Sequence, residues 1–448
     1  MKEQAIDMHG KIESPAGSPP SFTELAGISL RVGLLSFGGP AAQIALMHRY
    51  FVEERGWIAE DRFLHALNYC MLLPGPEAQQ LATYCGWLLH RVKGGLTAGL
   101  LFILPGAVAM LGLSFVYVLF GRLPLVESLF YGVKAGVLAI VLQALLKVGS
   151  RALKSRLSIA IAIASFLALF LFGIPFPAVI VAAALVAVAA DRKKGKRAAI
   201  PPQDAATPPR PGFLGTLAVG LSIWALPVVG AAVLISPDHL LVDVAGFFST
   251  LAVVSFGGAY ALLSYMAQVA VESYGWLSAG EMLDGLGLAE TTPGPLILVT
   301  QFVGFLAGFH APAPFPAAIA ATLAAAMTTW VTFAPSFLFI FLGAPFIERL
   351  RGNRRLSAAL SGITAAVTGT IANLALWFAL HVFFAETTNA PLWWIAAPIP
   401  TLTSIDPLAV ALALVAGWLV FFRKLGVATV VGASAVLGLA ARTAIGMP

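Results

Sequence analysis

The chain has 448 residues, of which 59% are hydrophobic and only 11% are charged. Ordinary soluble domains carry about 25% charged residues, so the composition excludes a soluble globular protein and predicts a polytopic membrane protein. The net charge is +6, but the basic residues gather in short loops beside apolar runs. That distribution fits the positive-inside rule and argues against a nucleic-acid partner.

The chain begins with a polar tail and continues with apolar runs. Residues 1–21 mix charges with Pro, Gly and Ser and have no apolar core segment, which predicts a disordered tail and not a signal peptide. Runs long enough to cross a hydrocarbon core of about 30 Å follow. They lie at residues 95–120, 125–146, 157–173, 174–190, 212–235, 320–344, 357–383, 405–422 and 426–445. We therefore expect an all-α integral membrane protein.

An internal repeat divides the chain into two halves. Sliding the sequence by 219 residues aligns 36–76 with 255–295 without gaps and gives 15 identities in 41 positions. The shared residues include the SFGG and PGP motifs, which predicts two homologous halves. We expect a first transmembrane repeat at 22–190, a cytoplasmic linker at 191–211, an extra span at 212–239 and a second repeat at 240–448.

The basic residues predict that the halves are oppositely oriented. The linker is basic and Pro-rich, and the loop 147–156 carries four basic residues, so both should be cytoplasmic. The loop 383–406, equivalent to 147–156, has no Lys or Arg, whereas 348–355 has four arginines. This pattern predicts an inverted-topology repeat, which is typical of secondary transporters. It requires 22–51 and 63–91 to be broken, hairpin-like or re-entrant elements at the FGG and PGP motifs.

The Gly and Pro motifs predict helix starts inside the apolar region. Pro74-Gly75-Pro76 separates two helical stretches, so a helix should begin near Glu77. Its free N–H groups and the positive end of its dipole could hold an anion without a buried countercharge. The alternative is that these motifs are only kinks or close helix contacts.

Two cations in apolar runs strengthen the anion hypothesis. Arg31 and Lys134 each lie where a charge costs at least about 2.5 kcal/mol, so something should compensate for them. Glu127, seven residues before Lys134 and on nearly the same helix face, is the structural candidate, and a translocated anion is the functional one. The equivalent positions in the second half are Thr250 and Thr364.

The predicted substrate-binding residues combine these cations with the motif residues and with neutral donors, which suit an oxyanion because they add no counterion. They are Arg31, Ser36, Gly38, Gly39, Gln43, Gly75, Glu77, Gln79, Gln80, Lys134, Ser255, Gly257, Gly258, Thr291, Thr292 and Gly294. Glu77 and Glu290 could carry a coupled proton if burial favoured their neutral form, or they could cap a helix start. The sequence has no nucleotide, nucleophile or metal motif, so we expect no catalytic residue, no metal and no cofactor.

The motifs also carry a family resemblance. The stretches "SFGGPAAQIALMHRYFVEERGW" and "LPGPEAQQLATY", with their second-half counterparts, resemble the CHR family of chromate transporters in its long, two-domain form. The resemblance covers nearly the whole chain from Phe22. It implies chromate efflux across the bacterial cytoplasmic membrane, with the proton motive force as energy source, and chromate resistance. The charge of the dianion separately predicts that an inside-negative membrane potential can drive the efflux. Many members have a His soon after FGGP, where this chain has Ala41, Ala42 and Gln43, and the second half has FGGA.

Two other functions stay open at this point. One is a permease for sulfate or another oxyanion, and the other, less favoured, is a membrane-embedded enzyme or channel. The expected partners are chromate, sulfate as a competitor and membrane lipid, with a homodimer as one option for the assembly.

Overall fold

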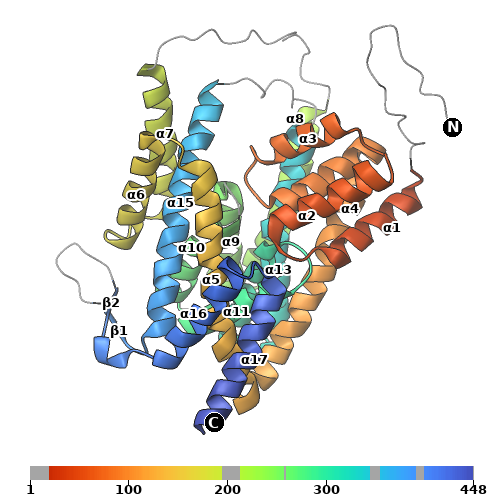
Figure 1. The fold of residues 1–448 in the computed structure, drawn as a ribbon. Helices are drawn as coiled ribbons and strands as arrows, with labels where there is room; N and C mark the ends of the chain where they lie inside the picture. The colour runs from red at the N-terminus through yellow and green to blue at the C-terminus, as the bar shows by residue number, and fades with distance from the viewer. Residues whose placement is uncertain (1–19, 194–211, 257–258, 344–353, 390–397, 447–448) are drawn as a thin grey trace, which may run out of the picture.

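The computed structural model describes residues 20–193, 212–256, 259–343, 354–389 and 398–446. The N-terminal tail, most of the linker and the pair Gly257 and Gly258 lie outside these ranges. All nine predicted apolar runs are helical (Figure 1). They form α4 (Glu77–Phe120), α5 (Pro124–Ala152), α6 (Arg156–Phe170), α7 (Phe176–Lys193), α8 (Phe213–Leu234), α13 (Ala317–Gly343), α15 (Arg354–Phe383), α16 (Pro407–Phe421) and α17 (Val427–Ile445).

Shorter helices flank the motifs, and the two halves repeat them in the same order. The first half has α1 (Phe22–Leu35), α2 (Gly39–His48), η1 (Arg49–Glu54) and α3 (Glu60–Cys70). The second half has α9 (Leu240–Val254), α10 (Ala259–Gln268), η2 (Val269–Ser273), α11 (Ala279–Thr291), η3 (Leu296–Leu298) and α12 (Val299–His310). A small antiparallel pair, β1 (Thr387–Asn389) and β2 (Pro398–Pro400), and the short helix η5 (Leu402–Ser404) precede α16.

Helix α4 is two helices that fold back on each other. His90 and Arg91 have non-helical backbone angles, and Gly86 packs directly against Gly94, since a Cβ on either would meet the carbonyl oxygen of the other. Residues 77–89 and 92–120 therefore form a hairpin, as α12 and α13 do in the second half. The predicted element 63–91 thus ends where the chain turns back.

The two halves are interleaved through their long helices. Helix α5 packs against α16 and α17 of the second half, while α15 packs against α6 and α7 of the first. Helices α5 and α15 also contact each other and run in opposite directions in Figure 1. The ends of α5 and α7 and the start of α15 lie at the upper end of that view, and the start of α5, β1 and β2 lie at the lower end. The main hydrophobic core draws buried residues from both halves.

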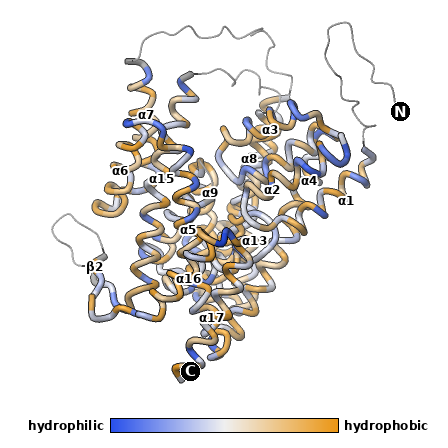
Figure 2. Tube along the Cα trace, viewed as in Figure 1, coloured by the Kyte–Doolittle hydropathy of each residue, from blue (hydrophilic) through white to orange (hydrophobic). Residues whose placement is uncertain are grey.

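The outer surface of the molecule is apolar. In the described chain, six helices (α4, α5, α8, α13, α15 and α17) are long and apolar enough to cross a membrane. Apolar residues dominate along the helices, and polar residues gather toward many helix ends (Figure 2). The exposed apolar surface is clearest on helix α8, where Leu226 and Leu234 are 71% and 85% exposed. Burial in lipid is the environment that such a surface requires.

Candidate functional site

The motifs of the two halves meet in two reciprocal contacts, which together we call the crossing. The amide of Gly75 donates to the carbonyl oxygen of Ser255 at 2.9 Å, and the amide of Gly294 donates to the carbonyl oxygen of Ser36 at 2.8 Å. Each PGP motif is therefore bonded to the SFGG motif of the other half, and the two bonds are related by the 219-residue repeat. The sequence predicted the motifs as site elements, and the fold joins them across the halves.

Close backbone approach explains why the crossing contains glycine. Gly75 has a φ of +117°, which a residue with a side chain rarely adopts. A Cβ there would also lie 2.6 Å from the Ser336 hydroxyl. On the other side, a Cβ on Gly106 would collide with the carbonyl oxygen of Pro293. Gly106 and Ser336 directly follow the prolines within α4 and α13, so these two helices brace the PGP motifs of the opposite halves.

Helices begin at the crossing without side-chain caps. Helix α2 begins at Gly39 after Gly38, α4 at Glu77 after Pro76, and η3 at Leu296 after Pro295. None of these three starts receives a side-chain hydrogen bond from its capping residue. Their first N–H groups and the positive ends of their dipoles are the features that bind anions at helix N-termini. The predicted helix start near Glu77 is confirmed.

Buried glutamines hold the backbone carbonyls of the crossing. The Nε2 of Gln43 donates to Gly294 at 2.6 Å and lies 3.5 Å from the Ser36 carbonyl oxygen. The Nε2 of Gln80 donates to Pro74 at 2.6 Å, and that of Gln301 donates to Ala107 at 2.9 Å. These amides therefore shape the backbone, and the uncapped N–H groups are the clearest donors for a ligand.

The remaining predicted polar residues lie around the crossing in different states. Gln79 is fully buried and donates to Thr83 at 2.9 Å. The hydroxyls of Thr291 and Thr292 donate back to their own helix. Glu290 accepts a 2.7 Å hydrogen bond from Tyr260. Glu77 has no hydrogen-bond or ion-pair partner among the described residues.

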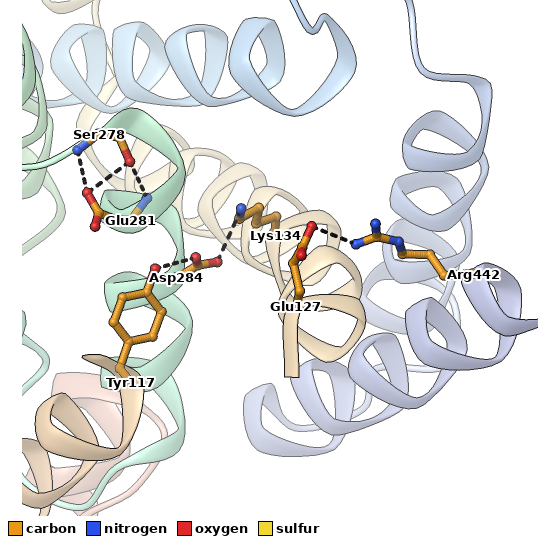
Figure 3. A network of polar contacts seen from close by, with 7 residues as sticks. All are labelled: Tyr117, Glu127, Lys134, Ser278, Glu281, Asp284 and Arg442. Atoms are coloured by element: carbon orange, nitrogen blue, oxygen red, sulfur yellow. Dashed lines mark hydrogen bonds and ion pairs between the residues drawn. The ribbon is translucent and has the colours of Figure 1, made fainter. Parts of the chain in front are cut away.

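Lys134 pairs with a carboxylate that the sequence analysis did not consider. Its Nζ lies 3.5 Å from Oδ1 of Asp284 in α11, and Glu127 pairs instead with Arg442 at 3.1 Å (Figure 3). The structural partner predicted from sequence, Glu127, was therefore wrong: helical spacing placed it near Lys134, but packing of α17 against α5 supplies it with Arg442. Lys134 lies beside the first turns of α11 and not at the crossing, where α11 ends.

Arg31 lies on the exposed side of α1, beside the exposed apolar residues Leu30 and Leu34. It has no hydrogen-bond or ion-pair partner among the described residues. The fold thus gathers the motif residues but leaves both cations outside that cluster. Asp284, Tyr117 and Gly106 were not predicted as site residues. For Asp284 the available signal was an acidic residue in the apolar helix that directly precedes a PGP motif.

The comparison with known proteins also divides the chain into its two repeated halves. The family model described as "Chromate transporter" matches residues 23–188 and 242–439, one segment for each half. The chain belongs to the chromate transporter family. It is also similar over most of its length to individual relatives. A "Chromate transport protein" of Pseudomonas aeruginosa is 32% identical over 94% of this chain and 92% of the relative.

Two further relatives of this chromate transporter carry similar names. A "Probable chromate transport protein" of Synechococcus elongatus is 29% identical over 79% of this chain and 83% of its own. A "Chromate transport protein" of Cupriavidus metallidurans is 29% identical over 79% of this chain and 82% of its own. No solved structure matches the chain. Family and apolar helices together identify a multi-pass membrane protein.

Proposed function

We propose that this transporter exports chromate across the bacterial cytoplasmic membrane and binds the dianion at the crossing. The observation that carries the proposal is the reciprocal pair of bonds, Gly75 to Ser255 and Gly294 to Ser36, which sets an uncapped helix start of each half beside the SFGG motif of the other half. Helix dipoles and N–H groups stabilise an anion without a fixed buried countercharge. Such a site can release the anion on the other side, because no strong ion pair has to be broken.

The two halves, in this proposal, are an inverted repeat with re-entrant hairpins. Helices α1, α2, α3 and the segment 77–89 have at most 14 residues each, or about 21 Å of helix, which is shorter than a hydrocarbon core. Their tips carry the motifs. The opposite directions of α5 and α15 support the inversion, and substrate sites of inverted-repeat transporters lie where such broken helices meet.

The direction of transport follows from charge. When the cell interior is negative, moving one negative charge outward releases about 2.3 kcal/mol per 100 mV. Moving a dianion outward therefore releases about 4.6 kcal/mol per 100 mV. That free energy sustains roughly a thousandfold gradient. The membrane potential alone is therefore sufficient for export, and export would confer chromate resistance. A proton carried by Glu77 or Glu290 would add coupling to the proton motive force.

In this proposal, the exposed Arg31 attracts the anion before the anion reaches the crossing. It lies five residues, or about one and a half turns of α1, from Ser36. An exposed guanidinium on α1 would raise the local concentration of an oxyanion near Ser36 without holding it.

Labelled chromate uptake into inside-out vesicles tests the function. Vesicles containing the protein should accumulate chromate when an inside-positive potential is imposed, and excess sulfate should compete. Vesicles without the protein are the control. Absence of potential-dependent chromate flux, with potential-dependent sulfate flux instead, would favour the sulfate permease and reject chromate as the substrate.

A further inference from the structure

Asp284, in α11 of the second half, contacts both long helices of the first half, α4 and α5. Tyr117 in α4 donates its hydroxyl hydrogen to Oδ2 at 2.9 Å. Lys134 in α5 places its Nζ 3.5 Å from Oδ1. Figure 3 shows the two side chains reaching Asp284 from different helices. One carboxylate thus links three helices that belong to two halves.

The pair is unequally buried. The side chain of Asp284 is 7% exposed and that of Lys134 is 29% exposed. Burial of a carboxylate is favourable only while its partners remain in place, so separation of the pair requires Asp284 to reach water or another donor. The absence of a side chain at Gly280 leaves room for the ammonium group, since a Cβ there would lie 3.3 Å from Nζ.

Helix α11 connects this pair to the crossing. Asp284 lies seven residues, about 10 Å along the helix, from the last residue Thr291, and Gly294 lies three residues after Thr291. Close packing holds the helix between them, because Gly285 leaves no space for a Cβ beside Phe302 and Gly287 leaves none beside Val133. A tilt of α11 at Asp284 is therefore transmitted to the PGP motif.

The residue types of the Lys134–Asp284 pair are not repeated at the equivalent positions. The repeat places His65 where the second half has Asp284, and Thr364 where the first half has Lys134. The Thr364 hydroxyl donates to Leu360 of its own helix at 2.8 Å. A carboxylate–ammonium bridge can form at only one of the two pseudo-symmetric positions, so the two ends of the molecule are not closed in the same way.

We propose that Lys134 and Asp284 form a gate between the crossing and the end of the molecule at which α5 begins. In this structure the bridge holds α11 against the first half, and in the proposal this contact closes that end. The bridge opens for the anion to pass, and α11 then moves with the second PGP motif. Lys134 and Asp284 act as positioning residues through α11. The inference rests on the proposed function only in taking the crossing as the substrate site.

A cysteine reporter on α11 tests the gate without using chromate. Leu288 lies one turn beyond Asp284 toward the crossing and is half-buried. Leu288→Cys is placed in a full-length background carrying Cys70→Ala and Cys85→Ala, so that the reporter is the thiol that reacts. Both native thiols are buried. An impermeant maleimide is then applied to right-side-out and to inside-out vesicles.

Opening the gate should expose the reporter from one side. Asp284→Asn and Lys134→Gln are each expected to raise the labelling rate at least tenfold from the side at which α5 begins, with no increase from the other side. The double variant Lys134→Asp with Asp284→Lys restores the bridge and should return the rate to within threefold of the parent. Asp284→Glu keeps the charge and should behave like the parent.

Arg442→Gln is the matched control. It breaks another inter-half bridge of α5, that with Glu127 at 3.1 Å, but this bridge reaches α17 and not α11 (Figure 3). Its labelling rate should stay within twofold of the parent. Unchanged labelling in both single gate variants, or equal increases in Arg442→Gln or from both sides, would overturn the gate. Loss of chromate flux with the predicted labelling intact would instead reject the proposed substrate and leave the gate standing.

Discussion

The amide nitrogen of Gly294 lies 2.8 Å from the carbonyl oxygen of Ser36, and their repeat equivalents Gly75 and Ser255 make the same contact at 2.9 Å. These bonds complete the hairpin tips of one half with backbone from the other. Neither half therefore contains a finished crossing. Substitutions that separate the two halves at this point should affect transport more than they affect membrane insertion.

Gly106→Ala tests the close approach at the second PGP motif. The new Cβ would collide with the carbonyl oxygen of Pro293 and press on the Cα of Gly294. Overpacking of this kind costs about 1–3 kcal/mol, and relieving it would displace Gly294 from Ser36. We expect chromate flux to fall at least tenfold at equal amounts of protein in the membrane.

Gly112→Ala is the control for that substitution. Gly112 lies on the same helix, and a Cβ there would meet nothing within 4 Å. It should keep full flux and insert normally. Equal flux in the two variants would contradict the role assigned to the Gly106 contact.

Gln43→Leu tests the amide that holds the second PGP motif. The substitution copies Leu262, the repeat equivalent, and removes the 2.6 Å hydrogen bond to the Gly294 carbonyl. A buried acceptor left without its donor costs about 1–3 kcal/mol. Vesicle flux should fall five- to tenfold. Gln43→Glu removes the donor and also adds a negative charge, so the chromate flux should be lower still than in Gln43→Leu. Normal flux in Gln43→Glu would contradict an anion at the crossing.

The motifs could be predicted from sequence because backbone rules act locally. Pro76 cannot continue the preceding helix and the repeat marks its twin, so the helix start at Glu77 was predicted and is confirmed. Apolar length likewise identified α5 and α15. The direct bonds between motifs of opposite halves were not predictable, because a repeat shows which segments are equivalent and not which ones touch.

The partner of Lys134 could not be predicted for a related reason. Helical spacing limits the candidates to the same helix, where Glu127 lies. The observed partner, Asp284, is 150 residues away in sequence and comes near only because α11 packs against α5. Arg442 reaches Glu127 in the same way, through the packing of α17 on α5. Electrostatic pairing between interleaved halves requires the topology first.

Glu77→Gln tests whether this carboxylate carries a proton. Glu77 begins α4 at the crossing, where its negative charge competes with the dianion for the same helix dipole. The variant should bind chromate at least threefold more tightly, measured as a lower KM. A pH gradient imposed at zero membrane potential should drive chromate in the parent and not in the variant, while potential-driven flux remains in both.

Glu290→Gln is the comparison for Glu77. Glu290 already accepts a hydrogen bond from Tyr260 at 2.7 Å, so a neutral amide can keep that bond by accepting it. If Glu77 is the coupled group, Glu290→Gln keeps the response to the pH gradient. Loss of the response only in Glu290→Gln would transfer the proton role to Glu290.

Cysteines at the two ends of the long helices test the inverted repeat. Ser150 is exposed near the end of α5, close to Lys147 and Arg151, and Glu386 is exposed just after α15, in a loop without basic residues. Because these positions lie at the ends of equivalent helices of the two halves, inversion places them on opposite sides of the membrane, and the basic residues assign Ser150 to the cytoplasm. In the background lacking Cys70 and Cys85, an impermeant reagent outside cells should label Glu386→Cys, and Ser150→Cys should react only in inside-out vesicles. Labelling of both cysteines from one side would require an even number of crossings between them and would reject the inversion.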